Sequence, residues 1–258
     1  MTSRISAITL NTFREAVRDR VLYNLVVFAL LLVASAPLFS QISIGMERLI
    51  VVNVGLTSIS IFGVIIAIFI GIGLVSKEIE KRTLYTILSR PVRRWEFIAG
   101  KYLGLMLTLV VNTALMTVGL YIALFTFAHG QNPGDPRLLV AVYFMVLELA
   151  VITAFTLLFS SFSSPIFSAI FTFALFVIGT FAEDLRGFAA LSHGLTKTLA
   201  TGIAYLVPNF ASLNVIGQVA HDQSISGRLI VFNTLYVLLY AGATTLAAIM
   251  VFERRNLN

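Results

Sequence analysis

Long apolar runs are the feature that most constrains how this chain can fold. Six of them are long enough, or nearly so, to cross the roughly 30 Å hydrocarbon core of a bilayer, which takes about 20 helical residues. They lie near residues 21–39, 49–75, 102–128, 138–160, 166–182 and 229–252, and the fifth is the shortest. We therefore expect an all-α membrane protein in which residues 1–258 form one transmembrane domain with six helices.

Composition excludes several other classes of protein. Hydrophobic residues make up 58% of the chain and charged residues 12%, whereas roughly a quarter of the residues of soluble domains are charged. The chain has no cysteine, which excludes disulfides and thiolate metal sites. The spacing of His129, His193 and His221 matches no metal site, so we expect no bound metal. We interpret the first apolar run as a retained helix rather than a cleaved signal peptide, because Pro37 follows the small residues Ala34–Ala36.

The distribution of basic residues predicts the orientation. If the N-terminus is cytoplasmic, thirteen of the eighteen Lys and Arg residues fall in inner segments, seven of them within residues 76–101. Cytoplasmic loops carry such an excess of positive charge. We therefore expect both termini on the inner side of a prokaryotic cytoplasmic (inner) membrane. The net charge of +6 is interpreted as this topological signal and not as a sign of nucleic-acid binding.

Two segments outside the runs are predicted to lie at the membrane surface. Residues 1–20 have one apolar face, which is typical of an interfacial helix; a frayed polar tail is the alternative. Within residues 183–228, "GFAALSHGLTKTLATGIAYL" predicts an amphipathic helix on the outer side, followed by the breaker "PNF" and a second short element. A seventh span is less favoured, because it would place Arg254 and Arg255 outside.

The loop at residues 76–101, "SKEIEKRTLYTILSRPVRRWEFIAGK", is the most charged stretch of the chain. Its first half predicts an amphipathic helix, in which Glu78 and Arg82 stand four residues apart in the favourable order for an ion pair. Pro91 ends that helix or starts the next, while Trp95 suits the membrane interface and Lys101 suits anchoring. The loop is thus predicted to form a helical hairpin at the cytoplasmic surface. Anchoring by positive charge alone is the alternative.

Two strings resemble a known family. "KEIEKRTLYTILSRPVRRWEFIAGKYLG" resembles the segment after the second span of type-2 ABC exporter permeases. The matching residues are Glu78, Thr83, Leu84, Leu88, Ser89, Pro91, Val92, Arg94, Phe97, Gly100 and Lys101. Arg82 stands where that family usually has glycine. "YLVPNFASLNVIGQVAHD" and the later "FERRNL" are similar to the subgroup that includes permeases linked to multicopper-enzyme maturation. The resemblance covers nearly the whole chain.

The resemblance implies a dimer, of identical or related permease chains, that binds two copies of a separate ABC ATP-binding subunit. ATP and Mg would belong to that partner, with no cofactor in this chain. Residues 1–20 match the family's elbow helix, and residues 183–228 match its extracytoplasmic helices. The implied ATPase contacts are Glu78, Arg82, Thr83, Leu84, Ser89, Arg90, Pro91, Arg93 and Arg94. The turn from Ser161 to Ser164 is a second implied contact.

The chain itself is not expected to be an enzyme. It contains no G-x-x-x-x-G-K-[ST] motif, and its one Gly-Lys pair, Gly100-Lys101, is followed by Tyr102. It has no Ser-His-Asp order and no carboxylate pair placed for hydrolysis. The glycines Gly71 and Gly73 lie inside an apolar run, so they predict a close helix contact rather than a phosphate-binding loop.

Glu148 is the exception within the membrane, because it lies near the middle of the fourth apolar run. A charged group at that depth costs a few kcal/mol or more, so it should face protein or a water-filled path, or be protonated. Two interpretations stay open. Either Glu148 lines the substrate route or the dimer seam, or it is a neutral carboxyl bonded to a helix neighbour such as Asn112.

We expect the membrane-spanning permease subunit of an ATP-driven ABC exporter. The alternative is a self-sufficient channel or secondary transporter, which the scarcity of intramembrane charge disfavours. A membrane-embedded enzyme ranks third. Lipids, peptides, small amphiphiles and mechanical work on an extracytoplasmic partner all remain open as the task of the exporter.

Overall fold

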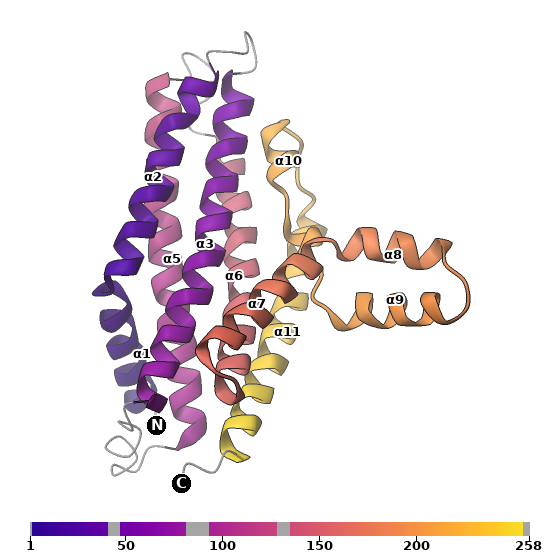
Figure 1. Cartoon of the computed structure of the whole chain (residues 1–258). Helices are drawn as coiled ribbons and strands as arrows, with labels where there is room; N and C mark the ends of the chain where they lie inside the picture. Colours follow the sequence, from indigo (N-terminus) through magenta and orange to yellow (C-terminus); the bar gives the residue numbers. More distant parts are fainter. Residues whose placement is uncertain (1, 41–46, 81–92, 128–134, 255–258) are drawn as a thin grey trace.

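The computed structural model describes residues 2–40, 47–80, 93–127 and 135–254, and these residues form helices and their connections (Figure 1). The helices are α1 (Thr2–Val17), α2 (Arg20–Ser40), α3 (Glu47–Glu80), α5 (Arg94–Phe127), α6 (Arg137–Phe162), α7 (Pro165–Thr180), α8 (Ala182–Leu191), α9 (Gly194–Leu206), the 3-10 turn η1 (Ala211–Leu213), α10 (Ile216–Ala220) and α11 (Gly227–Arg254). The expected all-α architecture is confirmed for this part of the chain.

Within the described part of the chain, four helices are long and apolar enough to cross a membrane. Their spanning segments are Arg48–Leu74, Arg94–Thr126, Arg137–Phe162 and Gly227–Arg254, and they correspond to the second, third, fourth and sixth apolar runs. The segment in α5 begins eight residues before residue 102, where the third run was expected to start. The helix begins earlier because "RWEFIAGK" continues it without a break. Part of the predicted cytoplasmic loop is therefore an extension of a spanning helix.

The first and fifth runs give shorter or bent elements. Helix α2 has 21 residues, fewer than the four spanning helices, and its apolar stretch is described over Arg20–Ser35. Helix α7 has 16 residues, or about 24 Å at 1.5 Å per residue, and it bends by 61° into α8. A second bent pair, α9 with α10, turns by 43°. The structure thus supports four spans, or up to six if each bent pair crosses as one.

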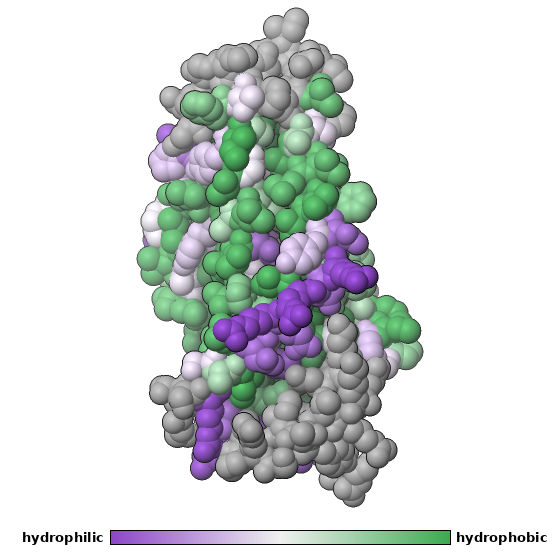
Figure 2. All heavy atoms as spheres, turned by 90° about the vertical axis from the view of Figure 1, so that its left-hand side faces the viewer, coloured by the Kyte–Doolittle hydropathy of each residue, from purple (hydrophilic) through white to green (hydrophobic). Residues whose placement is uncertain are grey.

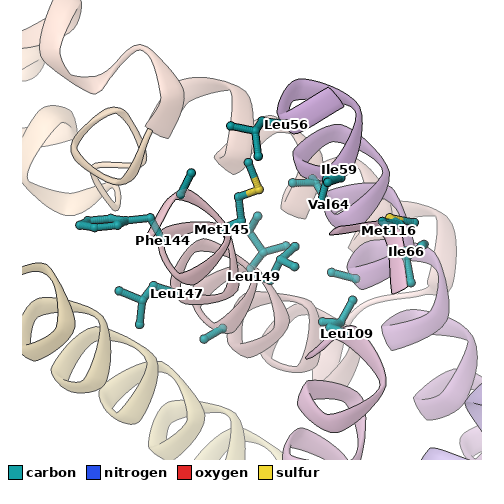
Figure 3. Close-up of a cluster of buried hydrophobic side chains, with 14 of the residues drawn as sticks. Leu56, Ile59, Val64, Ile66, Leu109, Met116, Phe144, Met145, Leu147 and Leu149 are labelled. Atoms are coloured by element: carbon teal, nitrogen blue, oxygen red, sulfur yellow. The ribbon is translucent and has the colours of Figure 1, made fainter. Parts of the chain in front are cut away.

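The core lies where α3, α5 and α6 face one another. Figure 3 shows Leu56 and Ile59 from α3, Leu109 from α5 and Leu149 from α6 within one buried cluster. A Cβ added to Gly71 would lie 2.7 Å from Thr156 Cγ2 on α6, which confirms a close helix contact at that glycine. The described residues give no such contact at Gly73, where an added Cβ meets none of them within 4 Å.

The N-terminal segment forms the helix α1, which packs against α5. In Figure 1 the start of α1, the end of α3, the start of α5 and the end of α11 lie at the same end of the bundle, here called the α1 end. The opposite end is called the distal end. Figure 2 shows a hydrophilic band across the lower half of the face that α1 and α2 form, which is otherwise mostly hydrophobic. Arg4, Arg14 and Arg18 of α1 are exposed.

The segment after α7 forms two helices rather than the single amphipathic helix that the sequence predicts. Helices α8 and α9 are antiparallel and project sideways from the bundle (Figure 1). The helix breaks because Ser192 is extended, with ψ 160°, and Gly194 has φ +61°, a left-handed conformation that glycine adopts readily. Leu191, Leu195 and Leu206 are exposed on this hairpin.

Candidate functional site

Most of the predicted ATPase contacts lie outside the described residues. They are Arg82, Thr83, Leu84, Ser89, Arg90 and Pro91. Glu78 falls in the helical end of α3, which extends without interruption from the spanning segment to Glu80. Arg93 and Arg94 are described and stand at the start of α5. Because α3 continues from the membrane into the loop at residues 76–101, it can carry motion from that loop to the membrane as a rigid element.

The start of α5 is bonded to the end of α11. Arg94 Nη1 donates hydrogen bonds to the carbonyl oxygens of Phe252, at 3.2 Å, and Glu253, at 2.8 Å. The last carbonyl groups of a helix lack partners within the helix and carry partial negative charge, so a guanidinium stabilises them. The Phe97 and Phe252 rings stack with centroids 5.8 Å apart. The string around "RRWEFIAGK" and the later "FERRNL", far apart in the chain, therefore meet at the α1 end.

Helix α1 packs directly on the backbone of α5. A Cβ added to Gly100 would lie 2.6 Å from Ile8 Cγ2. At Gly104 it would lie 2.6 Å from Thr12 Cβ and 2.8 Å from the carbonyl oxygen of Thr9. Small residues four apart allow helix backbones to approach closely in membranes. The Gly-x-x-x-Gly spacing of "GKYLG" thus forms a helix seam, and we define this α1–α5 seam by Ile8, Thr9, Thr12, Gly100 and Gly104.

Lys101 does not act as a surface anchor, contrary to its interpretation from sequence. Its side chain is 1% exposed, and its Nζ lies 3.6 Å from Glu15 Oε2 of α1. The same Nζ donates to the carbonyl oxygen of Leu74 on α3 at 3.5 Å and sits 5.7 Å from the centroid of the Phe97 ring. A lysine almost never becomes fully buried unless it is paired. Lys101 therefore joins α1, α3 and α5 at the α1 end.

Glu148 opens onto a cavity of about 260 Å³ between α3, α6, α7 and the segment from Phe210 to Gly217 in α10. The polar side chains that line it are Asn53, Thr57, Ser60, Glu148, Thr180 and Asn214. Ser60 Oγ donates a hydrogen bond to Glu148 Oε2 at 3.4 Å. Asn112 is buried on α5, does not line this cavity, and its amide nitrogen has no hydrogen-bond partner among the described residues. The structure thus brings Ser60, rather than Asn112, to Glu148.

A more apolar groove of about 370 Å³ adjoins this cavity. The two share Asn53, Thr57 and Ile61 of α3 as lining residues. The groove continues over α3 to Leu32 of α2 and is lined mainly by aliphatic side chains and Phe62. Cavity and groove together form an amphiphilic site along α3, with the carboxylate at one end.

An ion cluster at the distal end was missed by the sequence analysis. Arg48 donates to Asp135 Oδ2 at 2.7 Å and to both carboxylate oxygens of Asp222 at 2.8 and 2.9 Å. Arg137 donates to the carbonyl oxygen of Asp222 at 2.8 Å. Asp135 also caps α6, because its Oδ1 accepts from the backbone N–H of Arg137 at 2.9 Å. From the sequence, Arg48 and Arg137 are only two of the basic residues that fall outside the inner segments. Asp135 and Asp222 lie in turns, and nothing in the sequence indicates which residues they pair with.

Comparison with known proteins is consistent with this arrangement. Residues 6–257 match the family model described as ABC-2 family transporter protein. Comparison with curated proteins gives no match. Proteins of this family are multi-pass membrane permeases that lack ATPase activity themselves and act with an ABC ATPase subunit. The chain therefore belongs to the ABC-2 family and is the membrane permease subunit of an ABC transporter.

Proposed function

We propose that this permease is one of two membrane subunits of an exporter, and that the α1 end receives the motion of the ATPase subunits. The observation that carries the proposal is the set of contacts made by the start of α5. Arg94 bonds it to the end of α11, and Lys101 bonds it to α3 and contacts α1. A displacement of residues 76–101 would then move four helices together as a rigid body.

The Glu148 cavity is proposed to lie on the substrate route. A carboxylate within a membrane span is costly, and such groups usually face a bundle interior or a water-filled cavity that serves transport. Glu148 is 9% exposed and lines a cavity with five other polar side chains. This pattern supports the functional interpretation of Glu148 over that of a carboxyl that only satisfies a neighbouring helix.

Several finer features of the proposal rest on the sequence. The excess of Lys and Arg in alternate loops supports both termini on the cytoplasmic side, and a prokaryotic cytoplasmic membrane is the proposed location. The resemblance supports the exporter direction, the paired permease chains, the two ATPase copies and the multicopper-maturation subgroup. The turn around Ser163 and Ser164, between α6 and α7, is proposed as a second ATPase contact. A self-sufficient channel is no longer favoured, since membership of the family implies an ATPase partner.

Replacing Arg94 with alanine is expected to uncouple the permease from ATP hydrolysis. Loss of the two hydrogen bonds frees the end of α11 from α5. The ATPase subunit should still hydrolyse ATP, but the distal end of the permease should no longer respond to that hydrolysis. Because the chain has no cysteine, a single fluorophore at Ser224→Cys, an exposed distal position, can report that response. We expect an ATP-dependent fluorescence change in the complex with its ATPase, and its loss in Arg94→Ala.

The matched control is Arg14→Ala, which removes an exposed arginine of α1 at the same end and should leave the signal intact. An unchanged signal in Arg94→Ala would show that motion does not pass through the α5–α11 contact. Purification of the permease in mild detergent should also retain an ATPase subunit in equal amount. Recovery without any ATPase would contradict the proposed assembly.

A further inference from the structure

The charge of the Glu148 cavity selects the sign of its ligand. Among the described residues that line the cavity, Glu148 is the one charged side chain, and its polar neighbours are neutral asparagines, threonines and a serine. An anion would meet the carboxylate with no Lys or Arg to offset it. In a region of low dielectric constant that repulsion is far stronger than in water. The cavity is therefore suited to a cation.

The carboxylate also retains the capacity to bind one. Two carboxylate oxygens can accept about four hydrogen bonds, while among the described residues Glu148 receives a single long one, from Ser60 at 3.4 Å. Phe176 and Phe210 line the same cavity, with ring centroids 5.8 Å apart. Aromatic rings attract organic cations, so these two lining residues are also compatible with positive charge.

The adjoining groove indicates what the rest of the ligand is. It is lined by Leu32, Leu49, Ile50, Val54 and Phe62 together with the residues that it shares with the cavity. Small-molecule sites commonly occupy about 300–1,000 Å³ and combine mainly apolar walls with a few placed polar groups. A hydrated inorganic ion would leave such a groove empty. An organic cation with an apolar body fills both parts.

We propose that the cavity and groove bind an amphiphilic organic cation, with the positive group beside Glu148 and the apolar body along α3. This inference rests on the proposed function, because it assigns a substrate class to the proposed route. Ser60 positions the carboxylate, and the side chain of Thr57, which is exposed, stands where cavity and groove join.

Equilibrium binding of tetraphenylphosphonium to the purified permease–ATPase complex tests the proposal, with tetraphenylborate as an anion of the same shape. We expect Glu148→Gln to weaken binding of the cation by about tenfold or more, since the attraction between the two charges is lost. Tetraphenylborate, measured on its own because the two ions precipitate together, should not bind. Glu183→Gln removes an exposed carboxylate on α8 and should leave binding unchanged.

A second variant covers the case in which Glu148→Gln fails to fold. Thr57→Lys places a cation at the junction of cavity and groove, so it should abolish binding of tetraphenylphosphonium and permit that of tetraphenylborate. Equal affinity of both probes for the unmodified protein would overturn the proposal, as would undiminished cation binding in Glu148→Gln. If the cation binds but has no effect on ATP hydrolysis, the proposed cation site stands. Its proposed position on the substrate route is then contradicted. If the Ser224→Cys signal is intact but the cation does not bind, the proposed transmission of motion stands and the proposed cation site is overturned.

Discussion

Replacing Arg48 with methionine should lower the free energy of unfolding by about 3–5 kcal/mol, the cost of removing one member of a buried ion pair. The Arg48 and Asp135 side chains are only 9% and 10% exposed, and their atoms approach to 2.7 Å. Methionine fills much of the same space but leaves the Asp135 carboxylate buried without its partner. Unfolding of the purified permease in mixed micelles, followed by circular dichroism, measures the loss.

Two further variants separate charge burial from general disruption. Arg48→Met combined with Asp135→Asn removes both charges, and the asparagine can still accept the hydrogen bond from the Arg137 N–H, so most of the stability should return. Arg137→Gln alters a side chain that is 46% exposed, and an exposed ion pair contributes about 0–1 kcal/mol. If the double variant is as unstable as Arg48→Met, the buried charge is not the cause.

Local pattern was sufficient to predict the elements that carry the fold. Apolar runs of 20 or more residues became the long helices α3, α5, α6 and α11, because in lipid each backbone group must find its partner within the helix. The length of an apolar run also indicated which element would not be a single straight span. The fifth run was the shortest, and α7 is too short to cross alone and bends into α8.

Contacts between segments far apart in the chain could not be predicted from the local sequence pattern. Arg48 and Asp222 are 174 positions apart, and neither the run that follows Arg48 nor the turn around Asp222 indicates the other. Lys101 was interpreted from its position at the end of a charged loop, yet α1 and α3 cover it. Glu148 could be identified from the sequence because a charged residue within an apolar run is itself unusual. Its partner, Ser60, could not, since that contact depends on how α3 and α6 are aligned.

Replacing Gly104 with alanine should open the α1–α5 seam. The added methyl would lie 2.6 Å from Thr12 Cβ and 2.8 Å from the Thr9 carbonyl oxygen. Neither is the end of a flexible side chain, so α1 must shift as a unit. Overpacking of this kind costs about 1–3 kcal/mol, which exceeds the gain of up to about 1 kcal/mol in helix propensity from glycine to alanine.

A cysteine at Ala16, which is 0% exposed on α1, reports this shift directly. In the otherwise cysteine-free chain its reaction with a soluble maleimide should be slow, and Gly104→Ala should accelerate it while lowering the unfolding midpoint. Gly73→Ala is the matched control, because a Cβ there meets none of the described residues within 4 Å, and it should leave the labelling rate unchanged and stability equal or higher. Equal labelling in both variants would mean that α1 tolerates the methyl in place. Acceleration in Gly104→Ala alone would identify Gly104 as part of the surface that holds α1 against α5.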